Sequence, residues 1–133
     1  MKIGLVDDDR AVLRALTRLL SAYDHRVAAY ESAKEFLQHA PLATFDCILV
    51  DMWMPELNGF QLFDQLIRTG CKAPIIFITA HGDAVTREEA ARRGATMIIK
   101  PFDDTTLLAA INEAVASVRP DAGRTPPEIV PPE

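Results

Sequence analysis

Residues 4–10 read GLVDDDR, an apolar run that passes directly into three consecutive carboxylates, Asp7, Asp8 and Asp9. Like charges this close repel one another, so the arrangement needs a compensating group. Either the acids cap a helix that follows, or they surround a cation. The rest of the sequence decides between these explanations.

Composition limits the class of protein. A chain of 133 residues with a net charge of −5, a pI near 5.2 and no basic stripe suits one domain that does not bind nucleic acid directly. Its start does not resemble a secretion signal, and no apolar run reaches the roughly 18 residues of a membrane-spanning helix. We therefore expect a cytoplasmic protein without a membrane segment, whose partners are proteins or cations.

Apolar runs of strand length alternate with helical patterns along the chain. The runs are KIGLV (2–6), RVAAY (26–30), FDCILV (45–50), APIIFIT (73–79) and TMIIK (96–100). Three lack polar alternation, which is typical of strands covered on both faces. Because parallel neighbours need crossover connections, strand followed by helix five times predicts an α/β fold, a doubly wound five-stranded parallel sheet.

The helical segments have apolar faces and end signals. Residues 10–23 place Val12, Leu16, Leu19, Leu20 and Tyr23 on one face, and residues 104–118 do the same with Leu107, Ile111, Ala114, Val115 and Val118. Ser32 and Glu35 predict a capping box, and the segments GFQLFDQLIRTG (59–70) and DAVTREEAARRG (83–94) each stop at a glycine. Proline-rich sequence follows, so we expect a domain over 1–119 and a tail or linker over 120–133.

The polar residues gather where the predicted strands end. Asp7 and Asp8 end the first strand, Asp51 the third, Thr79 the fourth and Lys100 the fifth. Ligands bind at this edge of an open parallel sheet. Clustered carboxylates suit a hard divalent cation, Mg²⁺ with Mn²⁺ as a substitute, whereas Asp9 at the strand-to-helix turn is a helix cap.

The same donors suit phosphoryl transfer. A metal held by few carboxylates keeps positions for phosphate oxygens, and a lysine and a hydroxyl supply a charge and a hydrogen bond. A carboxylate can be the nucleophile and form an aspartyl phosphate. Asp51, central in the sheet and alone at its strand end, is the best candidate.

In this order, VDDD (6–9), DMWMPELNG (51–59), TA (79–80) and KPF (100–102) resemble the signature of response-regulator receiver domains of two-component signalling. The resemblance covers about residues 1–118, and HGD after TA is similar to receivers joined to helix-turn-helix output domains. It implies a flavodoxin-like receiver fold with strand order 2-1-3-4-5. It also implies a signalling phosphoacceptor that supports only its own phosphotransfer and autodephosphorylation, not an enzyme acting on other substrates.

Residue roles follow from the resemblance by position. Asp51 would accept a phosphoryl group from a phosphohistidine of a sensor histidine kinase or phosphotransfer protein, giving a 4-aspartylphosphate. Asp8, the Asp51 side chain and the Trp53 carbonyl would bind the metal, with Asp7 acting through water.

Two further residues complete the implied catalytic set. Lys100 would bridge Asp51 and a phosphoryl oxygen, and Thr79 would hydrogen-bond another and shift as it does so. The bond from Lys100 to Pro101 resembles the family's cis peptide.

The signalling face departs from the family pattern. Met97 stands where receivers usually have an aromatic residue, and GATMIIK (94–100) is one residue shorter than usual. The helix in 83–93 offers Val85 and small alanines but no large apolar stripe, so we expect loose docking. Partner binding, or a homodimer, through this helix, the strand at 96–100 and the helix over 104–118 is the expected readout.

Two other functions compete with this interpretation. A haloacid-dehalogenase-type phosphatase also uses an aspartyl nucleophile, threonine and lysine, but Trp53 stands where its second carboxylate belongs. A receiver-like interaction module that is never phosphorylated is the other alternative.

Overall fold

The computed structural model describes residues 1–118, which form five strands and five α-helices in alternation. The strands are β1 (Lys2–Val6), β2 (Arg26–Tyr30), β3 (Cys47–Asp51), β4 (Ile75–Thr79) and β5 (Thr96–Ile99). The helices are α1 (Arg10–Ala22), α2 (Ala33–His39), α3 (Gly59–Arg68), α4 (Ala84–Arg92) and α5 (Asp104–Val118), with a short 3-10 helix, η1 (Leu42–Thr44). The predicted tail, 120–133, lies outside the described residues.

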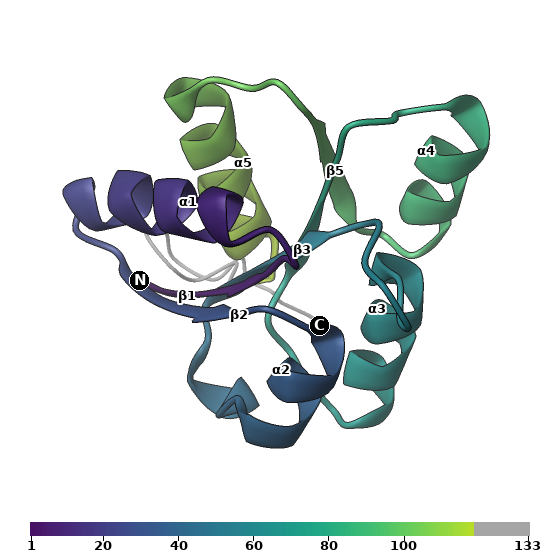
Figure 1. The fold of residues 1–133 in the computed structure, drawn as a ribbon. Helices are drawn as coiled ribbons and strands as arrows, with labels where there is room; N and C mark the ends of the chain where they lie inside the picture. The colour runs from purple at the N-terminus through teal and green to yellow at the C-terminus, as the bar shows by residue number, and fades with distance from the viewer. Residues whose placement is uncertain (119–133) are drawn as a thin grey trace, which may run out of the picture.

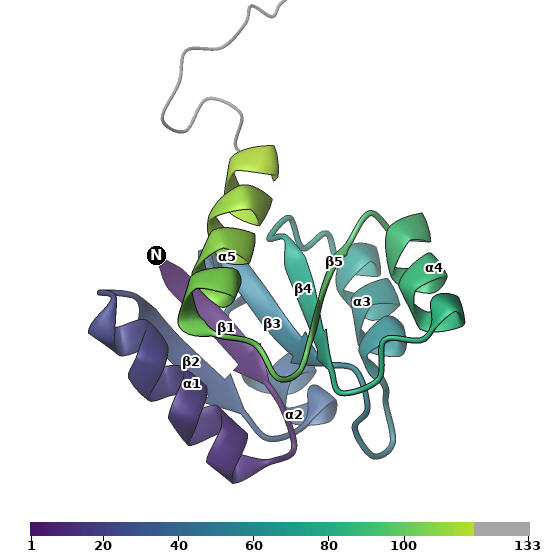
Figure 2. The ribbon, with the colours of Figure 1, turned by 90° about the horizontal axis from the view of Figure 1, so that it is seen from above.

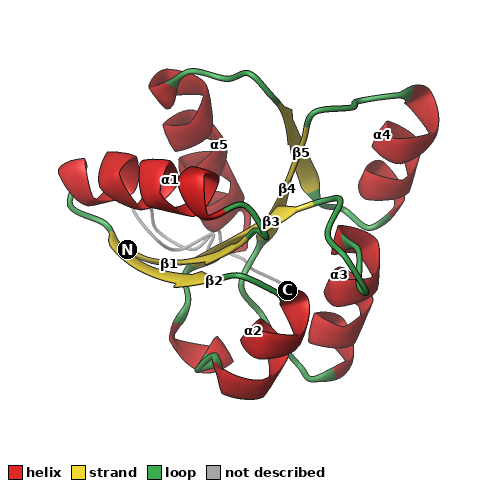
Figure 3. Cartoon of the chain, in the orientation of Figure 1, coloured by secondary structure: helices red, strands yellow, loops and turns green. Residues whose placement is uncertain are grey.

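The strands form one parallel sheet in the order β2-β1-β3-β4-β5, as the resemblance implied. Val6 is opposite Val50, Asp51 is opposite Ile78, and Thr79 is opposite Ile99. The register therefore brings the carboxyl ends of four strands to the same edge. Figure 2 shows the arrowheads of β1, β3 and β4 pointing the same way, and Figure 3 shows the loops that continue from them.

Helices cover both faces of the sheet and enclose two apolar cores. Figure 1 shows α1 and α5 on one side, α2 and α3 on the other, and α4 beside β5. One core joins α1 and α5 to side chains such as Leu5 and Leu49, and the other joins α2, α3 and Ala90 of α4 to Val50 and Phe77. Consecutive residues of β3 and β4 enter opposite cores, which explains why these runs lack polar alternation.

Two predicted helix faces need correction at their ends. In α1 the buried residues are Leu13, Leu16 and Leu20, whereas Tyr23 follows the last helical residue and is 50% exposed. In α5 the stripe Leu107, Ile111 and Val115 is buried, but Val118 is 48% exposed. Helical periodicity places residues on a face but does not say whether the core extends that far.

The helix caps explain where α1, α2 and α3 begin. Asp9 accepts hydrogen bonds from the Ala11 and Val12 amides, as predicted. Ser32 caps α2 by accepting from the Glu35 amide, but Glu35 accepts from the Glu31 amide rather than the Ser32 amide, so the predicted box is not reciprocal. A reciprocal capping box instead joins Asn58 and Gln61 at α3.

No helix within residues 1–118 is long and apolar enough to cross a membrane.

Candidate functional site

Three carboxylates meet at the carboxyl edge of the sheet. Oxygens of Asp7, Asp8 and Asp51 all lie within 4.8 Å of one another. Their exposure is graded, since Asp7 is buried, Asp51 is intermediate and Asp8 is exposed. The β1 and β3 ends thus form an acidic cluster that opens to solvent on the Asp8 side.

Asp7 is held on two sides. Its Oδ1 accepts from the Asp9 amide at 2.9 Å, and its Oδ2 lies 3.9 Å from Lys100 Nζ. Burial raises the pKa of Asp7, while the Asp9 amide and the Lys100 charge act in the opposite direction. The ammonium group predicted at the end of β5 therefore lies beside the acidic cluster.

Asp51 has the most perturbed carboxyl of the cluster. Burial, then repulsion from Asp7, raises the pKa of Asp51 to about 7, against partial compensation by Lys100. One nearby lysine does not neutralise three carboxylates. This donor set, all oxygen and partly open to solvent, fits a hard divalent cation.

Thr79 is fully buried at the end of β4, and its hydroxyl is engaged by its own loop. Thr79 Oγ1 accepts from the His81 amide at 3.0 Å and donates to the His81 carbonyl at 3.2 Å. The Lys100 amide donates to the Thr79 carbonyl at 2.8 Å, and the peptide from Lys100 to Pro101 is cis, as the resemblance implied. Thr79 and Lys100 are thus neighbours across β4 and β5.

The segment after Asp51 returns tightly to the sheet before α3 begins. The Gly59 amide donates to the Met52 carbonyl at 2.8 Å, and a Cβ on Gly59 would lie 3.1 Å from the Met52 Cα. Met52 and Met54 are buried, whereas the Trp53 side chain is 51% exposed. A small residue at 59 therefore allows the close approach that fixes this loop beside Asp51.

A comparison with protein families decides the classification. Residues 3–112 match the family model of the response regulator receiver domain. The chain belongs to this family. Receiver domains of this kind are parts of two-component phosphorelay systems, and the fold and motifs described above are those of a receiver domain.

Individual relatives agree with this assignment. The chain is 38% identical over 115 residues to the transcriptional regulatory protein TdiR of Thauera aromatica, covering 86% of this chain and 51% of TdiR. It is similar in structure to the response regulator StyR (33% identity, TM-score 0.81, 92% of this chain and 62% of that chain) and to FixJ-N (34% identity, TM-score 0.78, 86% and 92%). The chain spans about half the length of TdiR.

In this receiver domain, Met97 stands at the β5 position where receivers usually have an aromatic residue. Met97 is paired with Phe77 in the sheet register and packs, partly buried, against the α2–α3 core. The short segment before Lys100 still forms β5, so the Lys100 end of the site is kept. An unbranched side chain fills this position without a ring that must rotate.

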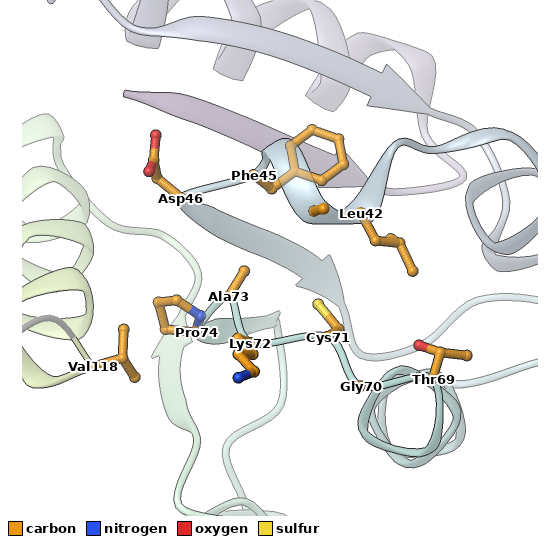
Figure 4. A pocket seen from close by; sticks show the side chains of 11 residues that line it. Leu42, Phe45, Asp46, Thr69, Gly70, Cys71, Lys72, Ala73, Pro74 and Val118 are labelled. Carbon is orange, nitrogen blue, oxygen red and sulfur yellow. The ribbon is translucent and has the colours of Figure 1, made fainter.

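Figure 4 shows a pocket of about 530 Å³. Its lining residues lie at the edge of the sheet where β3 and β4 begin, opposite the edge that bears the acidic cluster. It is lined in part by Phe45 and Asp46 before β3, Ala73 and Pro74 before β4, and Val118 at the end of α5. The length of the strands separates it from the carboxylates. The polar constellation, rather than the enclosed volume, therefore marks the candidate site.

Replacing Asp9 tests its assignment as a cap. We expect Asp9→Ala to lower the free energy of unfolding by about 1 kcal/mol, because two amides of α1 lose their acceptor. Chemical denaturation would measure this loss, and titration with Mg²⁺ would show unchanged affinity. Loss of metal affinity without loss of stability would make Asp9 a ligand instead.

The raised pKa of Asp51 predicts a pH-dependent stability in the absence of divalent ions. A carboxyl with a pKa of about 7 in the folded state and 3.8 when unfolded favours folding below pH 3.8, and this contribution is lost as the pH rises to 7. The full shift corresponds to about 4 kcal/mol, and solvent screening of this partly open carboxyl reduces it. As the pH rises between these limits, the free energy of unfolding of Asp51→Asn should therefore increase by about 1–3 kcal/mol relative to wild type. Thermal unfolding across the range would measure the difference. If the stabilities of wild type and Asp51→Asn changed with pH in the same way, the pKa of Asp51 would not be raised.

Proposed function

We propose that this receiver domain accepts a phosphoryl group on Asp51 in a reaction that depends on Mg²⁺. The supporting observation is the convergence of Asp7, Asp8 and Asp51, with Lys100 beside them, at one edge of the sheet. In transfer from a phosphohistidine, the P–N bond breaks as an Asp51 oxygen forms a P–O bond, and the imidazole leaves. A sensor histidine kinase or phosphotransfer protein would supply the group.

Each residue has a proposed task. Asp8, the Asp51 carboxylate and the Trp53 carbonyl would hold Mg²⁺ or Mn²⁺, with Asp7 linked through water. When bound, the metal supplies positive charge to the transferring oxygens. Lys100 would add a charge on the same group, and its ion pair with Asp7 keeps it near.

Thr79 would couple phosphorylation of Asp51 to a change in the loop that precedes α4. Its hydroxyl must leave the His81 backbone before it can donate to a phosphoryl oxygen, so phosphorylation would exchange one hydrogen bond for another. Because His81 lies in the loop that leads to α4, this exchange would act on the α4 side. Met97 favours a graded change in populations there.

The remaining assignments are proposals of the same kind. Residues 1–119 would be the receiver domain, 120–133 a tail or linker, and the location cytoplasmic. A homodimer through α4, β5 and α5 would use a groove of about 720 Å³ lined by residues such as Met97, Phe102 and Ala110. The phosphoacceptor role would make the protein a signalling component rather than an enzyme with a separate substrate.

Incubation with acetyl phosphate, a small phosphoryl donor, tests this function against its alternatives. With Mg²⁺, intact mass spectrometry should show one added phosphoryl group per chain, and chelation should prevent it. An unchanged mass would favour the interaction module that is never phosphorylated. Sustained hydrolysis of small phosphate monoesters would favour the phosphatase.

A further inference from the structure

Helix α4 is attached to the protein in an unusual way. Val85 is 70% exposed, and the only residues of α4 that are buried are Thr86 and Ala90. This agrees with the predicted lack of a large apolar stripe. Apolar burial alone therefore gives α4 little stabilisation, and other contacts must position it.

Those contacts converge on Arg93, the C-cap of α4. Its Nε and Nη2 lie 3.2 and 3.3 Å from the two carboxylate oxygens of Asp64 in α3. Its Nη1 donates to Glu89 Oε1 at 2.9 Å and to the Glu89 carbonyl at 3.2 Å. The guanidinium thus joins α4 to α3 through a two-point ion pair, which also fixes its orientation.

The same guanidinium lies on an aromatic ring. The Arg93 Cζ is 4.5 Å from the centroid of the Phe60 ring, and the Arg93 side chain is only 21% exposed. Hydrogen bonds to Asp64 and Glu89 raise the pKa of Arg93, so the guanidinium stays protonated. We call Arg93 with Phe60, Asp64 and Glu89 the Arg93 clamp. Because the Asp64 side chain is 50% exposed, the ion pair alone would contribute little, and the Phe60 ring and the second carboxylate of Glu89 add to it.

The clamp connects to the interior near the phosphoacceptor. The Phe60 ring packs edge-on against Phe77 of β4 at 5.1 Å, and Phe77 lies two residues before Thr79. Phe60 also belongs to the first turn of α3, which follows the loop that begins at Asp51. The C-terminal end of α4 is therefore tied to the parts of the fold that bear Asp51 and Thr79.

The N-terminal end of α4 has a different attachment. Asp83 caps it by accepting from the Thr86 amide at 2.7 Å, and Arg87 Nε donates to the Gly82 carbonyl at 2.7 Å. Gly82 lies so close to Ile99 of β5 that a Cβ on Gly82 would collide with the Ile99 side chain. The Asp83 and Arg87 hydrogen bonds lie within residues 82–87, so they can move as one unit with the loop. The contact of Gly82 with Ile99 is the one that would have to change when Thr79 leaves His81.

We propose that the Arg93 clamp makes the C-terminal end of α4 a pivot, which confines the movement caused by phosphorylation to the 80–87 segment. This inference rests on the proposed function for its trigger, but the attachment itself exists without phosphorylation. Removing the clamp should free the whole helix and increase the response at its far end.

Hydrogen exchange in the unphosphorylated protein tests the attachment. The reporters are the Gly94 and Ala95 amides, which donate to carbonyls at the end of α4. Arg93→Ala should speed their exchange by about fivefold to tenfold, because it removes both the ion pair with Asp64 and the contact with the Phe60 ring of α3. Asp64→Asn removes the ion pair but keeps the Phe60 contact, so it should speed exchange by a smaller factor, about twofold to fivefold. The matched control is Arg92→Ala, which removes only ion pairs within α4 to Glu88 and Glu89 and should change exchange by less than about twofold.

Amide chemical shifts with and without beryllofluoride test the pivot. In wild type, residues 80–87 should respond and residues 90–95 should not, whereas in Arg93→Ala both segments should respond. Equal exchange in all variants, or a response of residues 90–95 in wild type, would overturn the proposal. If neither segment nor Asp51 responded, the proposed phosphorylation would fail, while the exchange comparison would still decide whether the clamp holds α4.

Discussion

Asp51→Asn should abolish phosphorylation by acetyl phosphate. An amide oxygen is a poorer nucleophile than a carboxylate and carries no charge for the metal, so both the acceptor and a ligand are lost. We expect labelling to fall below detection while the domain stays folded, because removing one of three repelling carboxylates relieves repulsion in the cluster. Intact mass spectrometry with Mg²⁺ measures this directly.

A surface aspartate provides the matched control for this substitution. Asp24→Asn makes the same chemical change at a residue with a φ of 68°, a conformation that asparagine accepts well. We expect acetyl phosphate to phosphorylate Asp24→Asn to the same extent as wild type. Labelling of Asp51→Asn at the wild-type level would show that another residue accepts the phosphoryl group.

Asp8→Ala should weaken metal binding and phosphorylation together. Asp8 is the exposed member of the cluster. Without it, only the carboxylates of Asp7 and Asp51, which are less exposed to solvent, remain to bind the ion. We expect Mg²⁺ affinity to fall at least about 100-fold, more than the loss typical of an outer-shell residue. Titration monitored by the fluorescence of Trp53, the single tryptophan, would measure it.

The phosphorylation of Asp8→Ala should depend on the Mg²⁺ concentration. If Asp8 acts through the metal, raising the Mg²⁺ concentration should recover part of the labelling lost in Asp8→Ala. Unchanged affinity with reduced labelling would contradict the assignment of Asp8 as a ligand.

The fold was predictable because one local signal repeats along the chain. Continuous apolar runs such as the one ending at Asp51 indicate a sheet covered on both faces. The strand order was predicted only from the resemblance of the motifs to those of receiver domains. The errors lie at helix ends. Tyr23 continues the period of α1 but follows its last residue, and Val118 extends beyond the core at α5.

The positions of the site residues were predictable for a geometric reason. Parallel strands bring their carboxyl ends together, so the residue types at the ends of β1, β3 and β5 implied that Asp7, Asp51 and Lys100 lie close together, as they do. The bond between Thr79 and His81 was not predicted, because it depends on the path of a short loop.

The Arg93 clamp was also invisible in the sequence. Arg93 and Asp64 are 29 residues apart, and Arg93 stands in a charged run where a solvated side chain is the ordinary expectation. Only the packing of α3 against the end of α4 brings the pair together. In the proposal made above, α4 is loosely attached at its N-terminal end only, whereas the sequence alone led us to expect loose docking of the whole helix.

Asp51 is the residue that we propose carries the phosphoryl group. The most direct measurement is peptide mass spectrometry after acetyl phosphate treatment with Mg²⁺, followed by borohydride reduction of the acyl phosphate to mark the modified residue. We expect the reduction product at Asp51 and at no other residue. A product at another aspartate, Asp7 or Asp8 included, or no product in a sample whose intact mass shows the added group, would contradict it.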